Sequence, residues 1–135
     1  MIEYKTINKL NRKTIIELYK SAKWTNYTKN PEKLFKGIQN SLYTLGAFKK
    51  NQLIGLIRIV GDGYTIVYIQ DIIVHPNHQS KGIGQELMKK ILIRYEFVRQ
   101  KILLADHHEG LDRFYKKMGF IPSPESGLTC YVRLD

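Results

Sequence analysis

The chain has 135 residues, of which 43% are hydrophobic and 25% are charged, and its formal net charge is +10. These proportions are typical of a soluble globular protein and exclude a disordered chain. We expect one domain over residues 1–135, because a chain of this length buries a core without disulfides or metals.

Membrane insertion and secretion are not expected. No apolar stretch approaches the roughly 20 residues of a membrane-spanning helix, and the first residues lack the apolar segment of a signal peptide. The single cysteine, Cys130, has no partner for an internal disulfide, which agrees with a reducing compartment. We therefore expect a cytoplasmic protein without a membrane partner.

The positive charge has two explanations. A basic surface attracts anions such as phosphates or nucleic acid. The lysines are scattered, however, and no run of five basic residues occurs, so a solvated surface explains the charge equally well. Nucleic-acid binding would require a basic cluster with interleaved aromatic residues, which the sequence lacks. We expect no nucleic-acid partner.

The first forty residues predict a strand and two helices. Residues 2–5 alternate as a short strand, and the apolar spacing within residues 12–22 predicts an amphipathic helix. Asn30 is a candidate N-cap for a second helix over residues 31–40. The segment between the helices, residues 23–29, has no periodic apolar face and is predicted as a loop.

From residue 42 the apolar residues follow the two-residue period of strands. A polar turn and the glycine turn Gly61-Asp62-Gly63 separate three apolar runs, so we predict an antiparallel meander. Its strands cover residues 42–48, 53–60 and 65–74.

The second half predicts two helices and two strands. Apolar residues at nearly four-residue steps predict a helix from residue 83 to about Arg99, followed by a strand over residues 101–105 that pairs in parallel with the last meander strand. A further amphipathic helix ends at Gly119, and the final run, residues 128–134, is predicted as a closing strand.

The most informative stretch joins the last meander strand to the next helix. The strand ends at Val74-His75-Pro76, and a polar loop brings Gly82 and Gly84 to the helix start. The free N–H groups and the dipole of a helix N-terminus attract phosphate, and glycines permit a close approach. Leu87 replaces the third glycine of a dinucleotide fingerprint, and no P-loop motif occurs. The stretch therefore predicts a different kind of anion-binding loop.

Two motifs carry a resemblance to a known family. Gln79-x-x-Gly82-x-Gly84 resembles the acetyl-CoA pyrophosphate loop of the GCN5-related N-acetyltransferase (GNAT) superfamily. Tyr115-x-x-x-Gly119-Phe120 resembles the segment that follows the fifth strand of that fold. The resemblance implies an α+β fold with a central, mostly antiparallel sheet, a parallel strand pair at the acetyl-CoA cleft and about four flanking helices. It also implies direct acetyl transfer from acetyl-CoA to an amine, which we expect to belong to a small molecule.

The resemblance implies the cofactor contacts as well. Strand residues would hold the pantetheine arm and acetyl group, the loop would hold the pyrophosphate, and the second motif would add further contacts. His108 departs from the family pattern, because many members have Asn seven residues before the tyrosine. The predicted cofactor-binding residues are Ile72, Ile73, Val74, Gln79, Ser80, Lys81, Gly82, Ile83, Gly84, His108 and Phe114.

Two residues are candidates for proton transfer. The resemblance makes Tyr115 the general acid for the CoA thiolate, whereas helical periodicity alone would make it a core residue. Asp71 is a carboxylate in an apolar strand, which is costly unless it is paired or serves a site. It is a candidate general base, and the alternative is a structural partner of Arg58 or of a tyrosine hydroxyl. Gln70 is expected on the opposite face, as a weaker candidate for substrate binding.

We predict the acceptor site from the loop between the first two helices, because this loop lines the acceptor site in the resembling fold. Here it supplies Trp24 and Tyr27, whose rings suit a small amine, although Trp24 could equally cover the core edge. Asp106, His107 and His108 do not predict a metal site, because consecutive side chains diverge and no further ligands follow. A homodimer is compatible with the sequence. The alternative function is a non-catalytic CoA-binding or basic nucleic-acid-binding module.

Overall fold

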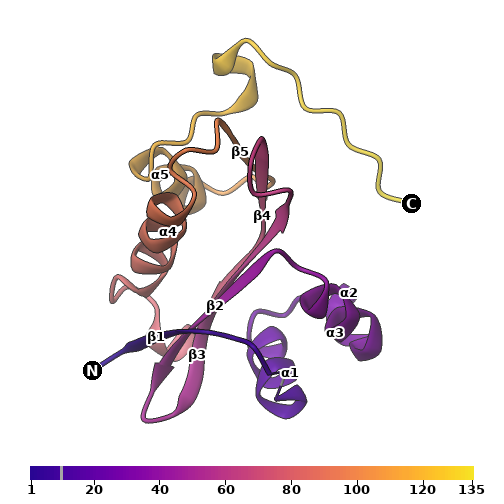
Figure 1. Cartoon of the computed structure of the whole chain (residues 1–135), viewed down its shortest axis with the longest axis vertical. Coiled ribbons are helices and arrows are strands. Elements are labelled where there is room, and N and C mark those ends of the chain that lie inside the picture. The colour runs from indigo at the N-terminus through magenta and orange to yellow at the C-terminus, as the bar shows by residue number, and fades with distance from the viewer. Residues whose placement is uncertain (10) are drawn as a thin grey trace. The chain divides into compact units, whose positions relative to one another are not determined.

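The computed structural model describes residues 1–9 and 11–135 (Figure 1). The chain divides into two compact units, Met1–Leu104 and Ala105–Asp135. The strands of the first unit are β1 (Glu3–Thr6), β2 (Tyr43–Lys49), β3 (Gln52–Gly61), β4 (Ile66–Val74) and β5 (Gln100–Leu103). They form a sheet in the order β1-β2-β3-β4-β5, antiparallel except for the parallel pair β4 and β5. The predicted α+β fold with a meander and a parallel pair is confirmed.

The helices of the first unit are α1 (Arg12–Ser21), α2 (Thr25–Thr28), α3 (Pro31–Gln39) and α4 (Ile83–Arg94). Figure 1 shows α1, α2 and α3 on one side of the sheet and α4 on the other. Asn11 and Asn30 cap α1 and α3, because their side chains accept hydrogen bonds from the backbone N–H groups of Thr14 and Lys33. The predicted cap at Asn30 is confirmed.

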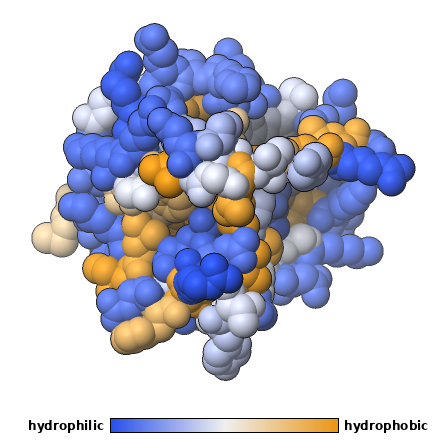
Figure 2. All heavy atoms as spheres, turned by 90° about the horizontal axis from the view of Figure 1, so that it is seen from above, coloured by the Kyte–Doolittle hydropathy of each residue, from blue (hydrophilic) through white to orange (hydrophobic). Residues whose placement is uncertain are grey.

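Both faces of the sheet are covered, which explains why β3 is apolar almost throughout. On one face, α1 and α3 pack against β3 and β4 through Ile15, Leu18, Tyr19, Leu34, Phe35, Leu56 and Ile73. On the other side, α4 buries Ile83, Leu87, Met88 and Ile91. Most of the molecular face seen in Figure 2 is hydrophilic. No helix within residues 1–9 and 11–135 is long and apolar enough to cross a membrane.

Within the first unit, the largest differences from the predicted elements lie at α2 and at the end of α4. Residues 23–29 are not entirely a loop, because Thr25–Thr28 form the single turn α2, whose Thr28 N–H donates to the Trp24 carbonyl. One turn is too short to show an apolar period. Helix α4 ends at Arg94 instead of Arg99, since Tyr95 leaves the helical conformation with a φ of −113°. Val98 is still buried, and this burial extends the apolar pattern beyond the helix end.

The second unit contains α5 (Glu109–Lys117) and the short turn η2 (Ser123–Ser126). Gly119 ends α5 as predicted: its φ is 92°, its N–H donates to the Lys116 carbonyl, and the Phe120 N–H donates to the Tyr115 carbonyl. The predicted closing strand over residues 128–134 is wrong, because this segment has no regular structure. Its apolar side chains are exposed, and an alternating pattern becomes a strand only when a neighbouring strand pairs with it.

Candidate active site

The loop after β4 presents backbone N–H groups at the start of α4. It passes through the turn η1 (Pro76–His78) and reaches Gly82, the N-cap of α4. Gly82 has a φ of 81°, a left-handed conformation that favours glycine, and a Cβ atom added there would meet nothing within 4 Å. The N–H groups of the first helical turn, which begins with Ile83 and Gly84, have no acceptor inside the helix. This geometry suits a phosphate.

Gln79 closes the loop against the strand end. Its Nε2 donates to the Val74 carbonyl at 3.1 Å, and Ser80, the next residue, is also left-handed with a φ of 62°. The His75 Nδ1 accepts the Asn77 N–H at 3.1 Å. These bonds hold the loop between the end of β4 and Gly82 in one conformation.

Basic side chains lie near His78 in this loop. Burial lowers the pKa of His78, and the nearby charges of Lys81, Lys49 and His75 lower it further. The His78 Nδ1 is buried and has no hydrogen-bond partner among the described residues. Lys49 ends β2, so the β2–β3 hairpin adds a charge that the sequence did not place beside the loop. The field of these groups favours an anion.

We expect a phosphate-bearing ligand to raise the pKa of His78, because its negative charge offsets the cations that lower that pKa. A group that gains a proton on binding makes binding stronger at lower pH. Affinity for CoA should therefore increase as the pH falls from the bound-state pKa to the free-state pKa, which lies below 6.5. NMR titration of the His78 ring with and without CoA measures the shift. An unchanged pKa at saturation would place the anion elsewhere.

The strand β4 has an unpaired edge beside the loop. β5 pairs only with Ile66–Ile69, whereas β4 continues along β3 to Val74. Among the described residues, no strand pairs with Ile72, Ile73 and Val74 on the β5 side. Apart from the Val74 carbonyl, which accepts from Gln79 Nε2, their main-chain groups on that edge are therefore available to an extended ligand.

A cluster of polar side chains connects β4 with β3 and the first two helices, and we call it the Asp71 cluster. Its members are Tyr19, Tyr27, Ser41, Arg58, Gln70 and Asp71. Asp71 is only 3% exposed and accepts hydrogen bonds from the Tyr19 hydroxyl at 2.8 Å, the Tyr27 hydroxyl at 2.7 Å and Arg58 Nε at 2.8 Å. Arg58 also donates to Ser41 Oγ at 3.2 Å. These bonds are those of the alternative given for Asp71, a structural partner of Arg58 or of a tyrosine hydroxyl.

Sequence analysis did not identify Tyr19 and Ser41 as members of this cluster. Tyr19 follows the apolar period of α1, and its hydroxyl is the only clue, because a buried tyrosine needs a hydrogen-bond partner. Burial raises the pKa of Tyr19 and of Tyr27, so both hydroxyls keep their protons at neutral pH. Both are therefore donors to the Asp71 carboxylate.

A β-bulge explains why Gln70 joins the cluster. Arg58 pairs with Asp71 but Ile59 pairs with Ile69, so Gln70 is an extra residue in β4. The prediction that Gln70 faces away from Asp71 is wrong, because Gln70 Nε2 donates to the same Tyr27 hydroxyl at 3.0 Å. The bulge breaks the alternation on which that prediction depends.

We expect Asp71→Ala to lower the free energy of unfolding by about 3–5 kcal/mol, because the buried Arg58 guanidinium loses its partner. The double variant Arg58→Met/Asp71→Leu should be less destabilised, since neither charge remains. Glu86→Ala is the matched control: its pair with Lys90 is exposed, and its loss should cost less than about 1 kcal/mol. Urea unfolding measures all three. Equal losses for Asp71→Ala and Glu86→Ala would contradict a structural ion pair.

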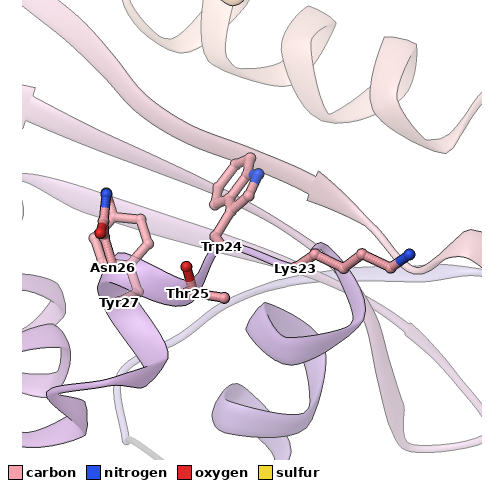
Figure 3. Close-up of a pocket in the computed structure, with 5 residues that line it drawn as sticks. All are labelled: Lys23, Trp24, Thr25, Asn26 and Tyr27. Atoms are coloured by element: carbon pink, nitrogen blue, oxygen red, sulfur yellow. The ribbon is translucent and has the colours of Figure 1, made fainter.

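A pocket of about 460 Å³ lies where α1 meets α2. Its volume is within the range of small-ligand sites. Figure 3 shows Trp24 projecting from the turn before α2 and Lys23 extending away from Tyr27. The Trp24 ring lies 6.1 Å from those of Tyr19 and Tyr27, and Trp24 also packs against the core. Trp24 therefore lines a pocket and also covers the core edge, and its role in an acceptor site stays a prediction.

The second unit contains the remaining predicted residues. Tyr115 lies on α5, with its ring 5.2 Å from Phe114 and 6.2 Å from Phe120. Burial raises the pKa of Tyr115, which keeps its hydroxyl protonated. His108 caps α5, because its Nδ1 accepts the N–H groups of Gly110 and Leu111 at 3.1 and 3.4 Å. No group of three metal-ligating side chains occurs in the described part of the chain.

Comparisons with known proteins agree with this geometry. Residues 7–130 match the family model described as "Acetyltransferase (GNAT) domain". The "Uncharacterized N-acetyltransferase ycf52" of Gracilaria tenuistipitata var. liui is 34% identical over 116 residues. The alignment covers 81% of this chain, and the chain spans 63% of the length of that relative.

Solved structures give the same picture over the whole chain. The GNAT family acetyltransferase SP0256 of Streptococcus pneumoniae is 32% identical, with a TM-score of 0.90, and the alignment covers 100% of this chain and 98% of that one. The aminoglycoside N-acetyltransferase AAC(6′)-Iy in complex with CoA has a TM-score of 0.75 at 13% identity, over 100% and 94% of the two chains. The second likeness concerns the fold alone.

Proposed function

The chain belongs to the GNAT family of acetyltransferases, and from this premise we propose that it transfers an acetyl group from acetyl-CoA to the amine of a small molecule. One observation carries the proposal: the loop that follows the unpaired edge of β4 ends at the left-handed Gly82, at the start of α4. A phosphate loop beside a free strand edge suits a ligand with both a pyrophosphate and an extended arm.

The proposed cofactor contacts follow this arrangement. The N–H groups of Ile83 and Gly84, with Ser80 and Lys81, hold the pyrophosphate, and the edge at Ile72–Val74 holds the pantetheine arm. A main-chain N–H of the same edge polarises the thioester carbonyl. Contacts from Gln79, Ile73, His108 and Phe114 rest on the resemblance to the family. The fold likeness to an acetyltransferase in complex with CoA supports the choice of ligand.

The proposed reaction is direct transfer. The amine nitrogen attacks the acetyl carbon, the C–N bond forms, and the C–S bond breaks as the thiolate leaves. From the resemblance to the family we assign to the Tyr115 hydroxyl the protonation of the thiolate, and the raised pKa of Tyr115 suits an acid that is protonated at neutral pH. Both Asp71 oxygens already accept hydrogen bonds from protein donors. These bonds favour proton loss from the amine to water over direct transfer to Asp71.

The acceptor is a small amine in the pocket that Trp24 and Tyr27 line. Free-thiol release from acetyl-CoA across a panel of amines tests the proposal. We expect turnover with at least one small amine. Acetyl-CoA binding without thiol release for any amine would favour the non-catalytic CoA-binding alternative. The cytoplasmic location and the homodimer remain predictions.

A further inference from the structure

We propose that the Asp71 cluster fixes Gln70 as the residue that orients the acceptor amine. This inference rests on the proposed function, because it concerns the acceptor side of the same site. It assigns a role to the buried pair Arg58 and Asp71 that neither the motifs nor the family comparisons supply: they position another residue.

The Tyr27 hydroxyl is the fixed point of this arrangement. It donates to Asp71 Oδ1 at 2.7 Å and accepts from Arg58 Nη2 at 3.2 Å and from Gln70 Nε2 at 3.0 Å. One donor and two lone pairs are all that a hydroxyl offers, so every position is used. Rotation of the Tyr27 hydroxyl would break its bond to Asp71 or to Arg58, which are both buried and charged.

The chemistry of these partners also fixes the orientation of the Gln70 amide. A carboxylate only accepts and a guanidinium only donates, so the Tyr27 proton points to Asp71. The remaining Tyr27 lone pair must accept, which requires the amide nitrogen of Gln70, and not its oxygen, to face Tyr27. Gln70 Oε1 therefore points away from the cluster. The Gln70 side chain is exposed, so this oxygen is open to a ligand.

The position of Gln70 on β4 suits a role with the acceptor. Gln70 is the bulge residue directly after Ile69, where pairing with β5 stops and the free edge of β4 begins. We propose that this edge binds the pantetheine arm that carries the acetyl group. Gln70 thus contacts the hydroxyl of Tyr27, one of the residues that line the pocket, and lies beside the start of the proposed donor site. An amine N–H is a donor that an oriented amide oxygen accepts.

Gln70 is a positioning residue, because an amide does not take up a proton at neutral pH. Its hydrogen bond aligns the amine nitrogen toward the acetyl carbon, and alignment of this kind lowers the barrier of a bimolecular step. Arg58 and Asp71 act one step further away, through Tyr27.

Trp24 allows this inference to be tested without turnover. It is the only tryptophan of the chain and lines the pocket, so its fluorescence reports amine binding. Amines are titrated against wild type, Gln70→Leu, Tyr27→Phe and the double variant, with CoA present, and the KM for each amine is measured separately. Gln39→Leu is the control, because Gln39 is also exposed and ends α3 on another part of the unit.

We expect Gln70→Leu and Tyr27→Phe each to weaken amine binding and raise the amine KM about 5–10-fold, which corresponds to one lost hydrogen bond. Acetyl-CoA affinity, the melting temperature of Gln70→Leu and all parameters of Gln39→Leu should not change. The double variant should bind amines about as weakly as the more impaired single variant, because both changes remove the same hydrogen bond to the amine.

Two results would overturn the inference: a wild-type amine KM and affinity in Gln70→Leu, or fully additive effects in the double variant. Absence of any amine-induced change in Trp24 emission would also overturn it, together with the acceptor site. Gln70-dependent amine binding without acetyl transfer would support the inference and contradict the proposed function. Acetyl transfer that does not depend on Gln70 would support the proposed function and contradict the inference.

Discussion

Replacement of Tyr115 with phenylalanine is expected to lower kcat about 100-fold while acetyl-CoA affinity stays at its wild-type value. Phenylalanine keeps the ring contacts with Phe114 and Phe120 but has no proton to give to the thiolate. Tyr131→Phe is the matched control, because that side chain is 91% exposed in the same unit and its change should leave kcat unaltered. Rapid-mixing kinetics of thiol release measure the chemical step.

The pH dependence supplies a second test of Tyr115. Because burial raises its pKa above the ordinary value of 10.0, the hydroxyl stays protonated to higher pH than a free tyrosine. The alkaline limb of the kcat profile should therefore lie above pH 10.0 and should disappear in Tyr115→Phe. Near-normal turnover in Tyr115→Phe, with chemistry rate-limiting, would make Tyr115 a packing residue and leave solvent as the proton donor.

Substitution of Gly82 with aspartate is expected to abolish acetyl-CoA binding. The new side chain would place volume and negative charge at the start of α4, where the pyrophosphate is proposed to bind. The left-handed conformation adds strain of about 1–2 kcal/mol for any residue with a Cβ atom. We therefore expect some loss of stability with the fold retained.

Gly127→Asp is the control that distinguishes the effect of backbone strain from the loss of the anion site. Its φ of 83° nearly equals the 81° of Gly82, and a Cβ atom added at either glycine meets nothing within 4 Å. Gly127→Asp should therefore carry similar strain and bind acetyl-CoA normally. Calorimetric titration of both folded variants decides the matter. Wild-type affinity in Gly82→Asp would show that the pyrophosphate does not bind at this helix start.

The order of the strands was predictable because its signals are local. Turn glycines such as Gly61 and Gly63, both with positive φ, separate the apolar runs, and Gly82 and Gly84 mark the loop that leads into a helix. The turn α2 was not predictable, because four residues show no period. The segment at residues 128–134 has the alternation of a strand, but pattern alone supplies no pairing partner.

The partners of Asp71 illustrate the limit within the site. The cost of burying a carboxylate predicts that Asp71 needs partners. Two of them, Tyr19 and Tyr27, are 52 and 44 residues away in sequence and belong to helices, so only the tertiary structure identifies them. The bulge at Gln70 is equally hidden, because it appears in the register between β3 and β4 and not in the apolar pattern.

The most direct test of the proposed activity is transfer of an isotope-labelled acetyl group. The protein is mixed with labelled acetyl-CoA and an amine that promotes thiol release, and the products are identified by mass spectrometry. We predict that the label appears on the amine nitrogen in the same amount as the CoA that is released, with no label on the protein. Release of CoA without label on the amine would contradict an N-acetyltransferase.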